Sequence, residues 1–186
     1  MVRVTHWITA ACFAALLVSG LEIVVSHPRF YWGEAGNIHT PPLFRIPVPA
    51  SRSTVPTGYG YTLPDQNGWS RALHFQTAWA VVLTGLLYGV HGMATSRFRR
   101  EQYRPLQRLA YAIVVVVLFP LMIWTGLAMS PAIASAFPFM VTAFGGQQSA
   151  RTLHFIVTML LVLFVVAHIV MVCRHGFRRL MRGMIG

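Results

Sequence analysis

Long stretches without charge are the feature that most restricts how this chain can fold. Charged residues are absent between Arg71 and Arg97, between Arg108 and Arg151, and between Arg151 and Arg174. A further stretch near the amino end contains only Glu22. Because a helix needs about 20 apolar residues to cross ~30 Å of hydrocarbon, these stretches predict four spans. They cover roughly residues 4–25, 72–94, 106–129 and 152–173.

The composition agrees with a membrane protein. Hydrophobic residues make up 55% of the 186, charged residues 10%, and the mean hydropathy is +0.58. These values exclude a disordered chain and argue against a soluble globular domain. We therefore predict an all-α membrane protein, a four-transmembrane-helix bundle that forms a single domain over residues 1–186. Pro131 and Pro138 should end the third span, and an apolar loop should follow.

The arginines predict the orientation. All 15 basic residues are arginine, and only four acidic residues oppose them. Ten arginines fall on one side of the predicted membrane, at positions 3, 97, 99, 100, 104, 108, 174, 178, 179 and 182. The other side has five, at positions 29, 45, 52, 71 and 151. By the positive-inside rule the richer side is cytoplasmic, so both termini should be cytoplasmic.

The long periplasmic loop, residues 26–71, differs from the spans. It contains seven of the 11 prolines and the aromatic sequence Tyr31-Trp32-Gly33, and it is too long for a simple turn. It is either a connector or a docking surface for a partner at the outer face. The two cysteines, Cys12 and Cys173, lie inside apolar runs and suggest neither a disulfide framework nor a zinc site.

Five of the eight histidines fall in or at the ends of predicted spans, namely His6, His74, His91, His154 and His168. An ionisable side chain in a membrane is costly and is a candidate functional residue. A single such histidine can also be satisfied by a neighbouring helix. His154 and His168, however, are fourteen residues apart, which returns to within ~40° of the same helix face after a rise of ~21 Å. Two imidazoles on one face at different depths suit two stacked haems, since neutral imidazole is a common axial ligand of haem iron.

Each iron needs a second imidazole at a matching depth. By the predicted topology His74 and His154 lie at the outer level, and His6 and His168 at the inner level. His74 and His154 should therefore ligate an outer haem, and His6 and His168 an inner haem. His91 competes with His6 for the inner iron, but it could instead donate a proton or sit at the interface.

Other residues near the histidines fit a haem protein. Arg71 and Arg151 each precede an outer histidine by three residues, so they share its helix face. Each could pair with a haem propionate or merely end a span. The pairs Ser19-Gly20 and Thr125-Gly126 let helices approach closely or leave room for a macrocycle. Pro120 should kink the third span. Glu22 has no settled role, and we find no convincing internal repeat.

Several motifs together resemble a known family. They are Val2-Arg3-Val4-Thr5-His6-Trp7, Leu17-Val18-Ser19-Gly20-Leu21, Tyr31-Trp32-Gly33, Arg71-Ala72-Leu73-His74-Phe75, Thr125-Gly126-Leu127-Ala128-Met129-Ser130-Pro131 and Gly145-Gly146 through Phe155. The chain resembles bacterial di-haem cytochrome b subunits, the group of cytochrome b-561 and of the cytochrome b anchors of nickel hydrogenases and formate dehydrogenases. The branch that accompanies periplasmic molybdopterin oxidoreductases of the sulfite-oxidase type is most similar. The resemblance puts the family's ligands on His6, His74, His154 and His168.

The resemblance implies two haem b groups and electron transfer across the inner membrane between a periplasmic redox partner and the quinone pool. The chain would then be an electron-transfer subunit of a membrane oxidoreductase. An alternative is a stand-alone oxidoreductase of the cytochrome b-561 type that passes electrons from superoxide or another small donor to quinone. A haem-free membrane scaffold is a third hypothesis. No nucleic-acid partner is expected, because the positive charge is explained by membrane topology.

Overall fold

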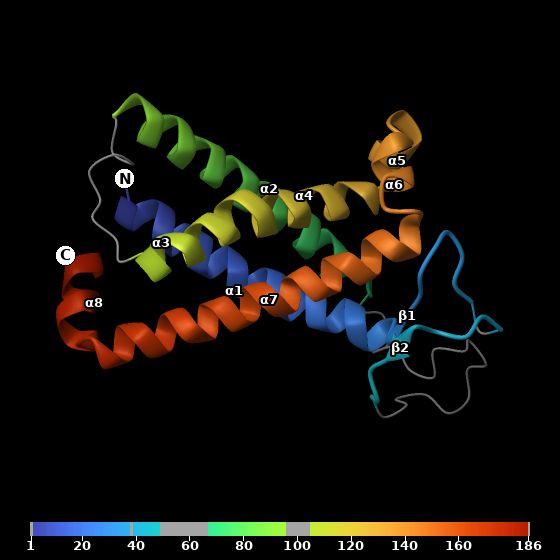
Figure 1. Cartoon of the computed structure of the whole chain (residues 1–186), viewed down its shortest axis with the longest axis horizontal. Helices are drawn as coiled ribbons and strands as arrows, with labels where there is room; N and C mark the ends of the chain where they lie inside the picture. Colours follow the sequence, from blue (N-terminus) through green and yellow to red (C-terminus); the bar gives the residue numbers. More distant parts are fainter. Residues whose placement is uncertain (1, 38, 49–66, 96–104, 186) are drawn as a thin grey trace. The chain divides into compact units, whose positions relative to one another are not determined.

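Four helices of membrane-spanning length and apolar composition dominate the computed structural model, which describes residues 2–37, 39–48, 67–95 and 105–185 (Figure 1). The candidate spans are Arg3–Ser26, Gly68–Gly92, Gln107–Ala128 and Gln147–Arg174. The prediction of an all-α membrane protein with four spans is therefore confirmed. The cytoplasmic location of the termini stays a prediction.

The chain divides into two compact units, each of which contains two spans. Unit 1 comprises Met1–Arg29 and Asn37–Glu101, and unit 2 comprises Phe30–Gly36 and Gln102–Gly186. That the two units act as one domain stays a prediction. Five of the arginines used to predict the topology lie outside the described residues: Arg52, Arg97, Arg99, Arg100 and Arg104.

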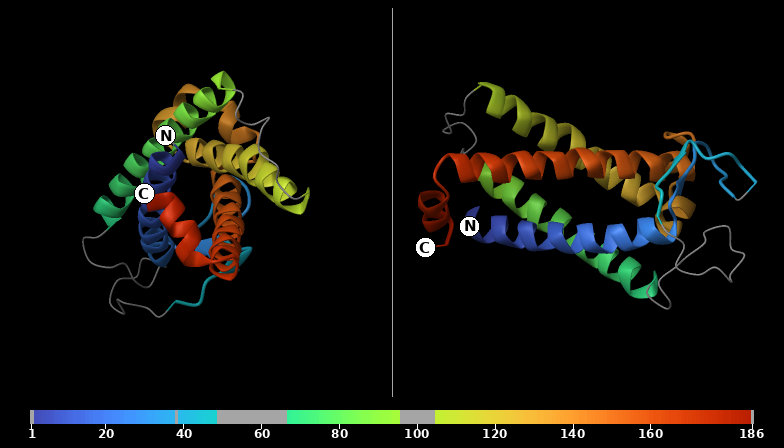
Figure 2. Two further views of the ribbon diagram at one scale, coloured as in Figure 1. Left: turned by 90° about the vertical axis from the view of Figure 1, so that its left-hand side faces the viewer. Right: turned by 90° about the horizontal axis from the view of Figure 1, so that it is seen from below.

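Unit 1 is built on a pair of long helices. Helix α1 (Val2–Ser26) and helix α2 (Asn67–Ala94) cross each other and run in opposite directions (Figures 1 and 2). Beyond α1, strand β1 (Arg29–Phe30) pairs with strand β2 (Phe44–Arg45). Just past β2, the backbone N–H of Ile46 donates to the carbonyl of Pro28 at 2.9 Å, which ties the start of the loop to the end of α1.

The third span, in unit 2, consists of three helical segments. Helix α3 (Pro105–Ala112) leads into a π-helix, η2 (Ile113–Leu118), which is followed by helix α4 (Phe119–Ala128). The N–H of Phe119 bonds to the carbonyl of Val114, five residues back. Pro120 has no N–H and crowds the carbonyl four residues before it, so the wider π-turn accommodates the proline where the sequence predicted a kink.

The rest of unit 2 contains one long helix and three short ones. Helices α5 (Pro131–Ala136) and α6 (Phe139–Thr142) occupy the segment predicted to be a loop, and they precede helix α7 (Gln147–Arg174) and helix α8 (Phe177–Ile185). Helix α7 packs on α4 and η2. A small core of Ala128, Val141 and Ala150 holds this end of the unit together. The prolines thus end the span but do not prevent short helices from forming after it.

Residues 30–36 dock onto the first turns of α7 and satisfy its free backbone donors. The N–H groups of Gln148 and Ser149 donate to the Gly33 carbonyl at 3.0 and 3.3 Å. The N–H of Gln147 donates to a carboxylate oxygen of Glu34 at 3.4 Å. A carboxylate at a helix N-terminus also interacts favourably with the positive end of the helix dipole. This part of the predicted loop is therefore an ordered cap on α7.

Burial along the spans is the reverse of that in a soluble protein. Hydroxyl residues include the most buried side chains, with Ser19, Ser70, Thr125 and Thr152 all 0% exposed. Large apolar side chains such as Leu163 are exposed, in that case by 65%. Small residues let helices approach closely where lipid is the outer solvent, and the apolar side chains then face that solvent. This pattern supports the membrane assignment independently of hydropathy.

The close approach of α7 and the 30–36 segment generates a stability prediction. A Cβ at Gly146 would meet the backbone of Gly33, and the φ of Gly146 is +128°. Neither problem can be relieved by rotating a side chain, so Gly146→Ala should destabilise the protein by about 3 kcal/mol or more. Gly145 has a φ of +74° with nothing within 4 Å, so Gly145→Ala should cost only about 1–2 kcal/mol.

Thermal unfolding in detergent checks this prediction. The Gly146→Ala protein should unfold at a clearly lower temperature than the Gly145→Ala protein. Equal losses in the two variants would show that backbone conformation, and not the contact with Gly33, accounts for the effect.

Candidate functional site

His74 lies on the second turn of α2 and faces α1 within unit 1. Its Nδ1 is 3.0 Å from the hydroxyl oxygen of Ser19. The same hydroxyl lies 2.7 Å from the Ala15 carbonyl and 3.2 Å from the Leu16 carbonyl. A serine hydroxyl has a single proton, and the backbone carbonyls can only accept one. When the hydroxyl donates its proton to a backbone carbonyl, its oxygen accepts a hydrogen bond from Nδ1–H of His74.

This arrangement suits one tautomer of His74. With the proton on Nδ1, a neutral imidazole presents an unprotonated Nε2 whose lone pair can bind a metal. Ser19 is 0% exposed, so water does not compete for the contact with Nδ1. His74 is thus held against α1 by a buried hydroxyl.

His154 occupies the equivalent position in unit 2. It lies on α7 and faces α4, where its Nδ1 is 2.9 Å from the Thr125 hydroxyl. That hydroxyl lies 2.8 Å from the Leu121 carbonyl and 3.1 Å from the Met122 carbonyl. With the proton on Nδ1, His154 donates to this hydroxyl in the same way as His74 does to Ser19.

A glycine next to each hydroxyl residue lets the imidazole pack against the helix backbone. A Cβ on Gly20 would lie 3.4 Å from Cε1 of His74, and one on Gly126 would lie 3.5 Å from Cε1 of His154. These are van der Waals distances, so each ring is in contact with the neighbouring helix. A branched side chain at either glycine would displace the imidazole.

The two arginines of the repeated sequence Arg-x-x-His have different surroundings. Arg71 is exposed at the start of α2. Arg151 is half-buried, and its guanidinium carbon lies 5.0 Å from the centre of the Phe30 ring, a cation–π distance. Phe30 also stacks on Phe155, with ring centres 4.5 Å apart. Both guanidiniums remain one helical turn from a histidine, as the spacing predicted.

The other three histidines of the predicted spans, His6, His91 and His168, lie toward the opposite ends of their helices. His6 is exposed near the start of α1 and makes an edge contact with Trp7 at 5.5 Å. His168 is half-buried on α7 and stacks on Phe164 at 6.3 Å. His91 lies in the last turn of α2, and because α1 and α2 run in opposite directions it is at the same end of unit 1 as His6. His91 therefore remains a competitor for an inner ligand position.

The sequence analysis did not identify Ser19 and Thr125 as hydrogen-bond partners. It interpreted Ser19-Gly20 and Thr125-Gly126 only as small residues at helix contacts. A signal was available, because both pairs are a hydroxyl residue followed by glycine and leucine, and both histidines stand in the sequence Arg-x-Leu-His-Phe. Aligning these two pairs of motifs would have suggested that each hydroxyl faces a histidine.

The fold and this site define a multi-pass membrane protein that carries paired helices with half-buried imidazoles held against buried hydroxyl groups. Over residues 1–186 the chain matches the family model described as prokaryotic cytochrome b561. The chain therefore belongs to the prokaryotic cytochrome b561 family, whose members bind haem b and transfer electrons in the membrane. This confirms the family resemblance seen in the sequence.

Among curated proteins, the chain is similar to one from Azospira oryzae that is provisionally named a protein-methionine-sulfoxide reductase subunit, YedZ1. The two are 26% identical over 202 residues, which cover 91% of this chain and 86% of the relative. No solved structure matches the chain significantly.

Proposed function

We propose that the chain binds two haem b groups and carries electrons across the bacterial inner membrane between a periplasmic redox partner and the quinone pool. His74 and His154 would ligate the outer iron, and His6 and His168 the inner iron. When bound, haem b supplies a one-electron iron couple, and ligation by two imidazoles leaves no open iron position. Oxygen activation is accordingly not part of the proposed function.

The matched orientation of His74 and His154 is the observation that supports this function best. Each Nδ1 lies within hydrogen-bond distance of a buried hydroxyl, and the tautomer with the proton on Nδ1 would present Nε2 to an iron, which is the donor chemistry that iron requires. Each imidazole also lies seven residues after the first residue of its helix, since α2 begins at Asn67 and α7 at Gln147. This equal spacing from the helix starts fits the outer level that the sequence predicted for both histidines.

The fourteen-residue separation of His154 and His168 supports a second, inner haem. Both lie on α7, which is helical from Gln147 to Arg174, so the rise of ~21 Å predicted from the sequence applies. At the outer level, Arg71 and Arg151 would pair with propionates, and the Arg151 guanidinium is already positioned over the Phe30 ring. Quinone would bind at a haem edge between helices.

A periplasmic partner is proposed to dock on the loop 26–71. Tyr31 is 1% exposed and anchors the ordered 30–36 segment, whereas Trp32 beside it is 58% exposed. An exposed tryptophan on a rigid support is typical of an interface anchor. The relative from Azospira oryzae is named as a reductase subunit, which supports a subunit role. The partner would be a molybdopterin oxidoreductase.

Haem content of histidine variants tests the ligand assignment. His74→Ala and His154→Ala should each lose the same haem, and His6→Ala and His168→Ala the other, because a single imidazole holds haem weakly. His91→Ala is the matched control and should retain both. The measurement is haem per chain with the reduced-minus-oxidised spectrum of each purified variant. Loss of one haem in His91→Ala, with both kept in His6→Ala, would contradict the assignment of His6 and His168 to the inner iron. A wild-type protein without b-type absorbance bands would contradict the whole proposal.

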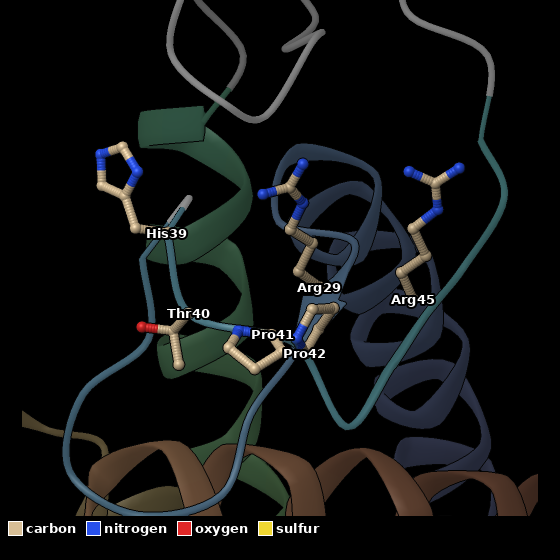
Figure 3. A pocket seen from close by; sticks show the side chains of 6 residues that line it. All are labelled: Arg29, His39, Thr40, Pro41, Pro42 and Arg45. Atoms are coloured by element: carbon tan, nitrogen blue, oxygen red, sulfur yellow. The ribbon is translucent and has the colours of Figure 1, made fainter.

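One feature of unit 1 favours the alternative function, a stand-alone superoxide- or small-donor:quinone oxidoreductase. Arg29, Arg45 and His39 line a pocket of about 300 Å³ together with Thr40, Pro41 and Pro42. Figure 3 shows that the two guanidiniums and the imidazole project to the same side. Two adjacent positive charges attract small anions. Superoxide would give up an electron to become dioxygen, and quinone would take up electrons with protons.

Substitution of these arginines separates the two functions. In the stand-alone case, Arg29→Ala/Arg45→Ala should slow haem reduction by an anionic donor roughly tenfold at low salt and weaken its dependence on ionic strength. Reduction by a neutral donor should not change. Arg178→Ala on α8, predicted to lie on the inner side, is the control. Stopped-flow absorbance measures these rates, and an unchanged rate together with co-purification of a partner subunit would favour the subunit function.

A further inference from the structure

We propose that Ser19 and Thr125 are equivalent positioning residues, which orient the two imidazoles of one haem iron and lower its reduction potential. The inference rests on the proposed function, because it takes His74 and His154 to be axial ligands. It goes further by assigning a role to two hydroxyl groups outside the ligand set. It also gives an independent way to ask whether the two histidines share an iron.

The first argument is that both units contain the same arrangement of atoms. The hydroxyl-to-Nδ1 distance is 3.0 Å at His74 and 2.9 Å at His154. The hydroxyl-to-carbonyl distance four residues back is 2.7 Å for Ser19 and 2.8 Å for Thr125. Two separate helix pairs thus reproduce one geometry, although α1 is a continuous helix and α4 follows a π-helix. Close agreement in such different helices indicates a shared requirement at the histidine.

The second argument concerns the direction of the hydrogen bonds. A hydroxyl that donates to its own helix accepts from the ring, and this pairing favours the tautomer with the proton on Nδ1. Because Ser19 and Thr125 are both 0% exposed, water does not compete for the hydroxyl. The backbone carbonyl and the hydroxyl together then favour one orientation of the imidazole.

The third argument links this geometry to electron transfer. A hydrogen bond from Nδ1–H increases the basicity of Nε2, and a more basic ligand stabilises ferric iron more than ferrous iron. Hydrogen bonding around the ligand set is one of the means by which proteins tune haem potentials. Loss of either hydroxyl should therefore raise the potential of the haem whose imidazole it contacts. If His74 and His154 share an iron, both losses act on the same haem.

A purely structural role is the competing explanation, because threonine and serine often bond to the carbonyl four residues back in membrane helices. Thr84 on α2 provides a matched control. Its hydroxyl donates to the Ala80 carbonyl at 2.7 Å, the same backbone contact that Ser19 makes. Thr84→Ala therefore removes a back-bonded hydroxyl without touching a proposed ligand. A structural role predicts similar effects in all three positions, whereas a positioning role predicts effects only at Ser19 and Thr125.

Redox titration and electron paramagnetic resonance of the haem-loaded protein test the proposal. Ser19→Ala and Thr125→Ala should each shift the potential of the same haem upward and change the g-values of its ferric signal. The double variant should shift it by about the sum, and the second haem should not change. Thr84→Ala should behave as wild type. Ser19→Thr and Thr125→Ser should restore the wild-type potential, because each keeps the acceptor oxygen.

Several outcomes would overturn the proposal. Unchanged potentials and g-values in both alanine variants, with haem retained, would show that the hydroxyls are only structural. Shifts in different haems would show that His74 and His154 do not share an iron. If an alanine variant loses haem, Ser19→Cys and Thr125→Cys keep the side-chain size but supply a weaker acceptor, and a potential equal to wild type would contradict the role. Absence of haem from the wild-type protein would instead contradict the proposed function.

Discussion

A neutral imidazole has one donor and one acceptor nitrogen, and inside a membrane neither can rely on water. This constraint underlies the arrangement of both helix pairs. In each, a hydroxyl on one helix donates to its own backbone and lies within hydrogen-bond distance of Nδ1 of the histidine on the helix packed against it. This contact gives Nδ1 a partner within the protein. An unsatisfied polar group in hydrocarbon costs several kcal/mol, so this pairing decides how the helices must face each other.

The two units repeat this solution with different supporting structure. In unit 1, α1 and α2 form a simple crossing pair, whereas in unit 2 a π-helix precedes α4 and the 30–36 segment caps α7. Common to both are the hydroxyl residue with the glycine and leucine after it, and the sequence Arg-x-Leu-His-Phe that contains the histidine. Under the proposed function, this likeness reflects two imidazoles that serve one haem.

Much of the fold could be predicted because a membrane makes local composition decisive. Charge-free stretches predicted four spans. Helices α1, α2 and α7 each include one of the predicted ranges. The remaining range, 106–129, is divided among α3, η2 and α4, which ends at Ala128. The histidines were recognisable since ionisable residues are rare in such stretches. The contribution of Ser19 and Thr125 was missed, because a hydroxyl residue in a span has the same local signature whether it serves packing or a ligand. The π-turn before Pro120 and the short helices α5 and α6 were missed for a similar reason, since local preferences there are weak.

By itself, the sequence determined that the chain spans a membrane four times and that histidines stand at two depths, because hydropathy and helical spacing do not depend on distant contacts. The family could also be recognised from short motifs. Only the tertiary structure decided which residue faces each histidine. Ser19 and His74 are 55 residues apart, and Thr125 and His154 are 29 apart. The register between two packed helices is set by side-chain contacts along their whole length, which no local pattern in the sequence specifies.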